Sequence, residues 1–298
     1  MKKDTKNISV SVRNRLLNIS NESNRDYNAI LRHYFQERFL YRISISQYRT
    51  SLVLKGAFLL MTKSISKFRQ TKDIDFLGIS IPSAVDKVTN IIKEIASIRY
   101  NDGVEFEIEN IKGTKIKEDA DFEGVRFKIP YRMDTIKGNF SIDIGFGDII
   151  TNGPFEIEFP VLLDFPVPKI LVYSLESAVA EKIEAIVNLN FVTSRMKDFY
   201  DLIFIAETKS FDRLTLKKAI IDTFKNRGTN LEDKATVFSD NFKNDPQKQR
   251  QWLSFIQLNK LEYKFNFSET VNKIQSFIDP VFDSKIKNNW NPEKWEWE

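Results

Sequence analysis

The sequence contains no cysteine and a single histidine, His33, among its 298 residues. Without thiols it can form neither disulfides nor cysteine-based zinc sites, and it has no thiolate nucleophile. One imidazole cannot supply both a zinc site and a catalytic base. Any chemistry must therefore use carboxylates, lysine, hydroxyl groups and hard metal ions.

Glycine is also scarce, with ten residues, and these do not have the spacing of the phosphate loop, the dinucleotide-binding turn or the nucleophile elbow. Three large classes of enzyme are thereby excluded. No apolar run is long enough to cross a bilayer, and the first residues do not resemble a secretion signal. We expect a cytoplasmic protein with no membrane partner.

The composition is that of an ordinary globular protein, with 42% hydrophobic and 29% charged residues. The 45 basic residues exceed the 41 acidic ones by only four, which gives a net charge of +4. A mixed surface of this kind permits a nucleic-acid partner without requiring one. One or two domains are expected for this length.

The hydrophobic pattern changes along the chain and predicts a mixed α+β fold. Helical periodicity covers residues 7–48, apolar runs and alternation cover residues 52–159, and helical periodicity returns after residue 173. Two prolines in the segment 164–168 mark a boundary. We expect N-terminal helices and a sheet core over residues 1–168 and a mainly helical domain over residues 169–298. The predicted strands are 52–54, 74–79, 104–111, 122–129, 140–150 and 170–173, and the predicted helices are 83–98, 175–189, 195–207, 214–224, 246–258 and 269–278.

Two acidic residues fall on one face of a predicted strand. Asp73 and Asp75 alternate with Ile74 and Phe76, so both carboxylates point the same way, about 7 Å apart. Upstream, Gly56 follows an apolar strand and precedes an apolar helical segment, where bare backbone amides could meet a phosphate. An exposed pair of acids is the alternative interpretation.

A third acid, Asp143, lies in the middle of another predicted strand, opposite in direction to the apolar residues Ile142 and Ile144. Aspartate is disfavoured in strands. It serves either as a further carboxylate of a site or as a solvated residue on a half-buried sheet.

A lysine interrupts the apolar stripe of a predicted helix in the second half of the chain. Lys182 lies among Val179, Ile183 and Ile186, and a short connection would let Asp198 on the next helix approach it. The lysine either reaches past the rim of the core, faces a negatively charged ligand, or forms a structural ion pair.

Taken in order, these segments resemble the AbiEii/AbiGii nucleotidyltransferase toxin family. The resemblance covers residues 52–205. The motifs are Lys55-Gly56-Ala57-x-x-Leu60, Thr71-Lys72-Asp73-Ile74-Asp75, Ile142-Asp143-Ile-Gly-Phe-Gly-Asp148, Ala180-Glu181-Lys182-x-x-Ala185 and Arg195-Met-Lys-Asp198-x-x-Asp201-Leu202.

The resemblance implies a nucleotidyltransferase mixed-sheet core of the DNA-polymerase-β-like superfamily and a helical C-terminal domain. It implies the toxin of a toxin–antitoxin pair in abortive infection, or phage defence, that transfers nucleotides from an NTP to an RNA such as a tRNA 3′ end. Mg²⁺, in a two-metal site, is the implied cofactor, and a cognate antitoxin is the implied partner. The implied catalytic residues are Asp73, Asp75, Lys182 and Asp198; the nucleotide-binding residues are Lys55, Gly56, Ala57, Thr71 and Lys182; the metal ligands are Asp73, Asp75 and, more weakly, Asp143. The family usually has serine where this chain has Ala57, so a hydroxyl contact to the triphosphate is missing.

Two other functions stay open at this point. The same fold could transfer a nucleotide to a small molecule or a protein, or it could be an inactive nucleic-acid or partner-binding module. After residue 207, basic residues alternate with aromatic ones, which is typical either of an RNA surface with stacking side chains or of a solvated face over an aromatic core. The segment 290–297, with three tryptophans, docks either on the protein itself or on a partner.

Overall fold

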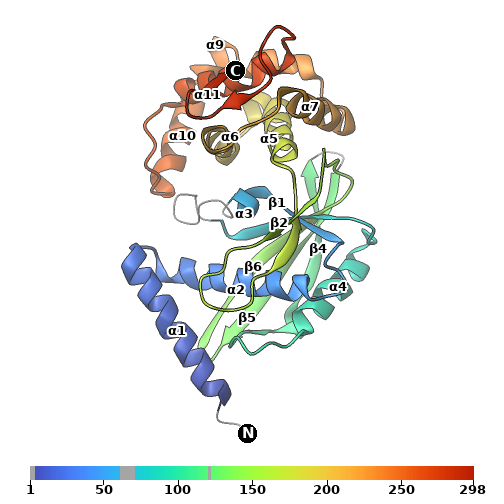
Figure 1. Cartoon of the computed structure of the whole chain (residues 1–298), viewed down its shortest axis with the longest axis vertical. Coiled ribbons are helices and arrows are strands. Elements are labelled where there is room, and N and C mark those ends of the chain that lie inside the picture. The colour runs from blue at the N-terminus through green and yellow to red at the C-terminus, as the bar shows by residue number, and fades with distance from the viewer. Residues whose placement is uncertain (1–3, 61–70, 120–121) are drawn as a thin grey trace. The chain divides into compact units, whose positions relative to one another are not determined.

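A computed structural model describes residues 4–60, 71–119 and 122–298 of the chain (Figure 1). The residues form two compact units. The first consists of residues 1–147 and 154–172, and the second of residues 148–153 and 173–298. The predicted domain division at residue 168 stays a prediction.

The first unit is built on a mixed sheet. Among the described residues the strand order is β3-β5-β6-β2-β1-β8-β7, and β4 pairs with β5. The pairs β1–β8 and β2–β6 are parallel, and the remaining pairs are antiparallel. The strands are β1 (Leu52–Lys55), β2 (Asp73–Gly78), β3 (Glu105–Phe106), β4 (Lys112–Asp119), β5 (Phe122–Met133), β6 (Ile136–Gly145), β7 (Phe155–Glu158) and β8 (Lys169–Val172).

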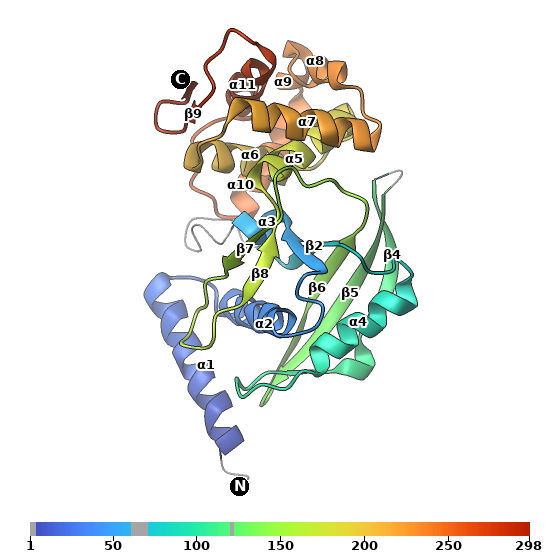
Figure 2. The same ribbon diagram turned by 45° about the vertical axis from the view of Figure 1, so that its right-hand side comes forward.

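Two helices cover one face of this sheet. Helices α2 (Tyr27–Ser44) and α4 (Val85–Ser97) both lie in front of the sheet in Figure 2. Phe35 of α2 stacks on Tyr131 of β5 with 3.7 Å between ring centroids, and the apolar strand residues Ile74 and Ile142 are fully buried. Helix α1 (Asp4–Ser23) packs against α2. Because side chains alternate along a strand, the opposite face receives the polar residues, and we call it the polar face.

The second unit is mainly helical, as the periodicity predicted. Ser174 caps the first of its long helices by accepting a hydrogen bond from the Ser177 amide. Arg195 occupies the N-cap position of the next helix without a capping side-chain hydrogen bond. The helices are α5 (Leu175–Leu189), α6 (Met196–Thr208), α7 (Arg213–Arg227), α8 (Lys234–Val237), α9 (Asp240–Lys243), α10 (Pro246–Leu258) and α11 (Phe267–Ile278).

The tryptophan-rich segment docks on the second unit itself. Strands β9 (Trp290–Asn291) and β10 (Glu296–Trp297) form a small antiparallel pair. The Trp290 indole is buried and donates to the carbonyl of Ala206 at 2.8 Å, and the Trp297 indole donates to the carbonyl of Phe277 at 3.0 Å. These contacts tie the segment to α6 and α11.

The predicted α+β class is confirmed, but one predicted strand is wrong. Residues 104–111 form only the two-residue strand β3 and a 3-10 helix, Ile108–Asn110. Strands β4 and β7 were not predicted, because the lysines and glycine of Lys112–Asp119 hide its alternation and because β7 is short and exposed.

Candidate active site

The two acids of the second motif lie side by side on the polar face of β2. Ile74 and Phe76 are fully buried on the other face, whereas Asp73 and Asp75 are half-buried. The parallel pairing of β2 with β6 places Ser141 beside Asp73 and Asp143 beside Asp75. Three carboxylates therefore belong to neighbouring positions on the polar face, as the alternation predicted for the first two.

Gly56 gives the carboxylate of Asp75 its space. The glycine begins the short helix α3 (Gly56–Leu60) with a φ of +67°, a conformation that side chains of L residues rarely adopt. A Cβ atom at this position would lie 2.2 Å from Oδ2 of Asp75. The backbone of the Lys55-Gly56-Ala57 motif thus packs directly against an acid of the second motif, and only glycine permits this contact.

The remaining residues of these two motifs lie next to the acids and hold the backbone of β2. Antiparallel pairing of β1 with β2 sets Lys55 opposite Asp75, and both Lys55 and Ala57 are buried. The hydroxyl of Thr71 donates to the backbone carbonyl of Asp73 at 3.1 Å, so it secures the entry to β2. In the described structure, the Thr71 hydroxyl therefore has a backbone carbonyl as its hydrogen-bond acceptor.

Arg126 of β5 binds the third carboxylate with both oxygens. Its Nε and Nη2 atoms lie 2.8 and 2.6 Å from Oδ1 and Oδ2 of Asp143, a bidentate geometry that is the strongest form of such a pair. The hydrogen bond to Asp143 raises the pKa of Arg126, and the charges of Asp73 and Asp75 act in the same direction. The guanidinium therefore lies within the electrostatic reach of all three acids.

These residues fit a divalent cation as a pair of ligands. Two carboxylates on one strand face are hard oxygen donors of the kind that Mg²⁺ prefers, and the lack of a side chain at Gly56 leaves room for the Asp75 carboxylate. Within the described ranges, no group of three or more acidic or histidine side chains is arranged to hold a metal ion. Asp143 as a third ligand stays a prediction, and both of its oxygens bind Arg126.

The lysine and the aspartate of the later motifs meet inside the second unit. Nζ of Lys182 on α5 lies 3.1 Å from Oδ1 of Asp198 and 2.7 Å from Oδ2 of Asp201, both on α6. Arg195 donates from Nε to the other oxygen of Asp198 at 2.5 Å. The predicted approach of Lys182 to Asp198 is therefore present as part of a network of four charged side chains, which is called here the lysine network.

The charges in the lysine network keep Asp198 ionised. Burial alone would raise the pKa of this carboxyl, but the positive charges of Lys182, Arg195 and Lys197 lower it well below its ordinary value. The Asp201 carboxylate is also completely buried. Two carboxylates thus hold the ammonium group of Lys182 in one place, and the lysine side chain is only slightly exposed.

Sequence reasoning missed Arg126 and named Asp201 only within its motif, without a role in the site, although a signal for each exists. Arg126 follows from the hairpin, because a turn after Met133 puts Arg126 opposite Asp143 when the register is counted back. Asp201 lies three residues after Asp198, one helical turn further along the same face. A second buried cluster in this unit pairs Arg227 with Asp148 at 2.8 Å and with Glu184 at 3.0 Å, and it anchors residues 148–153 to the helices.

Four aromatic residues after residue 207 have a structural role. Phe224, Phe238, Phe242 and Trp252 are all buried, so they form the core of the helical unit. The interpretation as stacking side chains for RNA is therefore wrong for these four.

In the part of the chain that is described, no helix is long and apolar enough to span a membrane.

Comparisons with known proteins agree with the motifs. The family model described as nucleotidyl transferase AbiEii toxin, type IV TA system, matches residues 38–265. A search of the curated proteins found no matching sequence. A crystal structure of a nucleotidyltransferase candidate from H. pylori has a TM-score of 0.48 and 15% identity, over 86% of this chain and 95% of that chain. The structure of JHP933 from Helicobacter pylori has a TM-score of 0.49 and 16% identity, over 86% of this chain and 92% of that chain.

The family model spans well over half of the chain and includes every motif from Lys55 to Asp201. On this match, and with the motif residues placed as described, the chain belongs to the AbiEii nucleotidyltransferase toxin family of type IV toxin–antitoxin systems.

Proposed function

We propose that this toxin transfers a nucleotidyl group from an NTP to the 3′ end of an RNA, such as a tRNA, in a reaction that requires Mg²⁺. The observation that carries the proposal is the contact between Gly56 and Asp75 beside Asp73. It combines bare backbone, suited to a triphosphate, with two carboxylates suited to a hard cation.

Asp73 and Asp75 would hold the cation in this reaction, and the cation, when bound, neutralises phosphate charge and favours ionisation of the attacking hydroxyl. The chain supplies the rest. The amides near Gly56 and Ala57 would orient the triphosphate. Arg126 would keep the Asp143 carboxylate from adding uncompensated negative charge to the site.

Lys182 and Asp198 are proposed to serve the same transfer. The lysine network holds the Lys182 ammonium in place, since carboxylate oxygens of Asp198 and Asp201 lie within 3.1 Å of it. A fixed positive charge can stabilise the phosphate oxygens as charge develops on them, and it does so without first having to order a flexible stem. Asp198 acts through the lysine in this scheme, as a positioning residue.

The test is transfer of label from each α-labelled NTP to deproteinised cellular RNA in the presence of Mg²⁺. We expect Asp73→Ala and Asp75→Ala to lower transfer by at least about 100-fold and to remove growth arrest on expression. Asp86→Ala, which removes an exposed acid from α4, is the matched control and should behave like the wild type. Folding of every variant is checked by circular dichroism.

Two results would overturn the proposal. Growth arrest by the folded Asp73→Ala/Asp75→Ala variant would show that toxicity does not need the acids. Label that appears in protein or in a small molecule while RNA stays unlabelled would give the enzyme another acceptor.

A further inference from the structure

The polar face of the sheet continues as a row of basic residues beyond the acids. Register places Arg126 opposite Asp143, and the next positions of β5 on the same face are Lys128 and, four residues later, Arg132. Lys112 of β4 lies opposite Lys128, and Lys137 of β6 lies opposite Arg132. All of these basic side chains are exposed.

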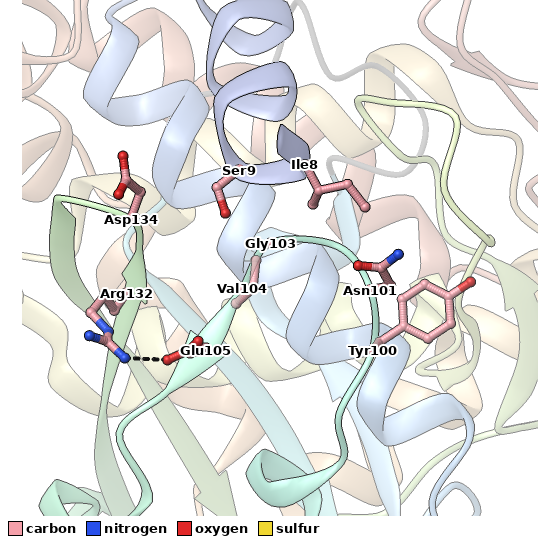
Figure 3. A pocket seen from close by; sticks show the side chains of 9 residues that line it. All are labelled: Ile8, Ser9, Tyr100, Asn101, Gly103, Val104, Glu105, Arg132 and Asp134. Carbon is pink, nitrogen blue, oxygen red and sulfur yellow. Dashed lines mark hydrogen bonds and ion pairs between the residues drawn. The ribbon is translucent and has the colours of Figure 1, made fainter. Parts of the chain in front are cut away.

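Both pairings set like charges directly against each other. Cβ atoms opposite each other in an antiparallel pair are about 5 Å apart, and like charges at that distance destabilise the sheet. Arg132 has a compensating carboxylate, because it also pairs with Glu105 of β3 (Figure 3). Lys112, Lys128 and Lys137 form no ion pair with any described residue. The pair of Lys112 and Lys128 thus carries a repulsion that no ion pair with a described residue relieves.

The row has the length of a short nucleic-acid strand. Arg126 and Arg132 are six positions apart on β5, which corresponds to about 20 Å along the strand. At about 3.4 Å per stacked nucleotide this is room for about six phosphates. One end of the row lies at the acids. The other end lies at a pocket of about 290 Å³ whose lining includes Arg132, Asp134 and Ser9 (Figure 3).

We propose that Lys112, Lys128 and Lys137 bind the phosphate backbone of the acceptor RNA and lead its 3′ end toward Asp73 and Asp75. The proposal rests on the proposed function and names the surface that the acceptor uses. A linear polyanion fits this row better than a compact anion, because the charges follow the strands and successive phosphates can lie between them. This surface is separate from the basic segment after residue 207, where Phe224, Phe238, Phe242 and Trp252 are buried.

The test measures binding of a fluorescent single-stranded RNA in EDTA, where transfer does not occur, at several salt concentrations. Lys112→Glu/Lys128→Glu/Lys137→Glu is compared with Lys87→Glu/Lys93→Glu/Arg99→Glu, which makes the same change of charge on and next to α4, the helix on the opposite face. We expect the first variant to lose at least about tenfold in affinity at low salt, with a slope in log salt smaller by about two. The control should stay within about threefold.

A second measurement separates binding from structural damage. Lys128→Glu alone puts a carboxylate opposite Lys112, so its thermal midpoint should rise while its RNA affinity falls; Lys128→Arg should keep the affinity. Equal loss of RNA affinity in both triple variants would overturn the proposal. Competition by poly-glutamate that binds as tightly as RNA would overturn it as well.

Failure of this proposal is distinct from failure of the proposed function. If the triple lysine variant transfers nucleotides to RNA with an unchanged KM for RNA, the enzyme stands and the acceptor binds elsewhere. If the wild type binds RNA through these lysines and transfers nothing to it, the surface stands and the activity does not.

Discussion

Replacement of Lys182 by methionine tests how the second unit is held together. Met fills the volume of the lysine stem, and from the sequence alone this variant is expected to remain packed. The structure changes that expectation, because the Lys182 side chain is only 10% exposed and its ammonium contacts two carboxylates that are 2% and 0% exposed. Loss of one partner from a buried ionic network typically costs about 3–5 kcal/mol.

The free energy of unfolding should therefore fall by about 3–5 kcal/mol in Lys182→Met at pH 7. Asp198 keeps its contact with Arg195, so most of the loss should come from Asp201. The measurement is urea unfolding followed by circular dichroism at 222 nm. Lys218→Met, which breaks an exposed pair with Asp222 on α7, is the control and should change stability by no more than about 0.5 kcal/mol.

A companion variant tests the electrostatic origin of the loss. Lys182→Met/Asp201→Asn removes a buried negative charge together with its partner and should recover roughly half of the lost stability. If this double variant is folded but inactive, the lysine charge serves the transfer as well as the fold. A Lys182→Met variant within about 1 kcal/mol of the wild type would refute the account of the network.

Two further predictions concern backbone and pH. Gly56→Ala should lower stability by about 1–2 kcal/mol because of the positive φ, and it should also abolish transfer, because the added Cβ displaces Asp75. The control Gly228→Ala, with a φ of +68° and nothing within 4 Å of the added Cβ, should show the stability loss alone. Normal transfer by Gly56→Ala would contradict the role given to the contact between Gly56 and Asp75. Burial and the charge of Arg25 lower the pKa of His33 to about 3, so below pH 6.5 the unfolded state binds a proton that the folded state does not. The free energy of unfolding should therefore decrease by about 1.4 kcal/mol for each unit by which the pH is lowered. In urea unfolding, His33→Phe should lose about 2 kcal/mol less than the wild type between pH 6.5 and 5, and parallel curves would refute the assignment.

The alternation of Asp73 and Asp75 with apolar residues predicted the strand, its polar face and the acid pair correctly. Strand order was harder to obtain, because the parallel pairing of β2 with β6 joins segments about 70 residues apart and leaves no local pattern. The same pairing brings Asp143 beside Asp75. Its engagement with Arg126 depends on the hairpin register, which the sequence contains but a motif search does not read.

Two regions show where local patterns mislead. Residues 104–111 have the apolar residues of a strand, yet Ile108–Asn110 forms a 3-10 helix, because only two residues of this segment pair with β5. In the helical unit, aromatic residues between basic ones have the same spacing whether they face solvent or the core. Their burial is decided by the packing of several helices, which the spacing alone does not encode.

The docking of residues 289–298 has a consequence for the timing of folding. This segment bonds to Phe211, Ala206 and Phe277, and a ribosome makes it after every helix that it touches. While it is still inside the exit tunnel, the apolar surfaces of α6 and α11 that receive Trp290 stay open to water. The helical unit can therefore complete its packing only after residues 289–298 have left the tunnel, later than the helices that receive them.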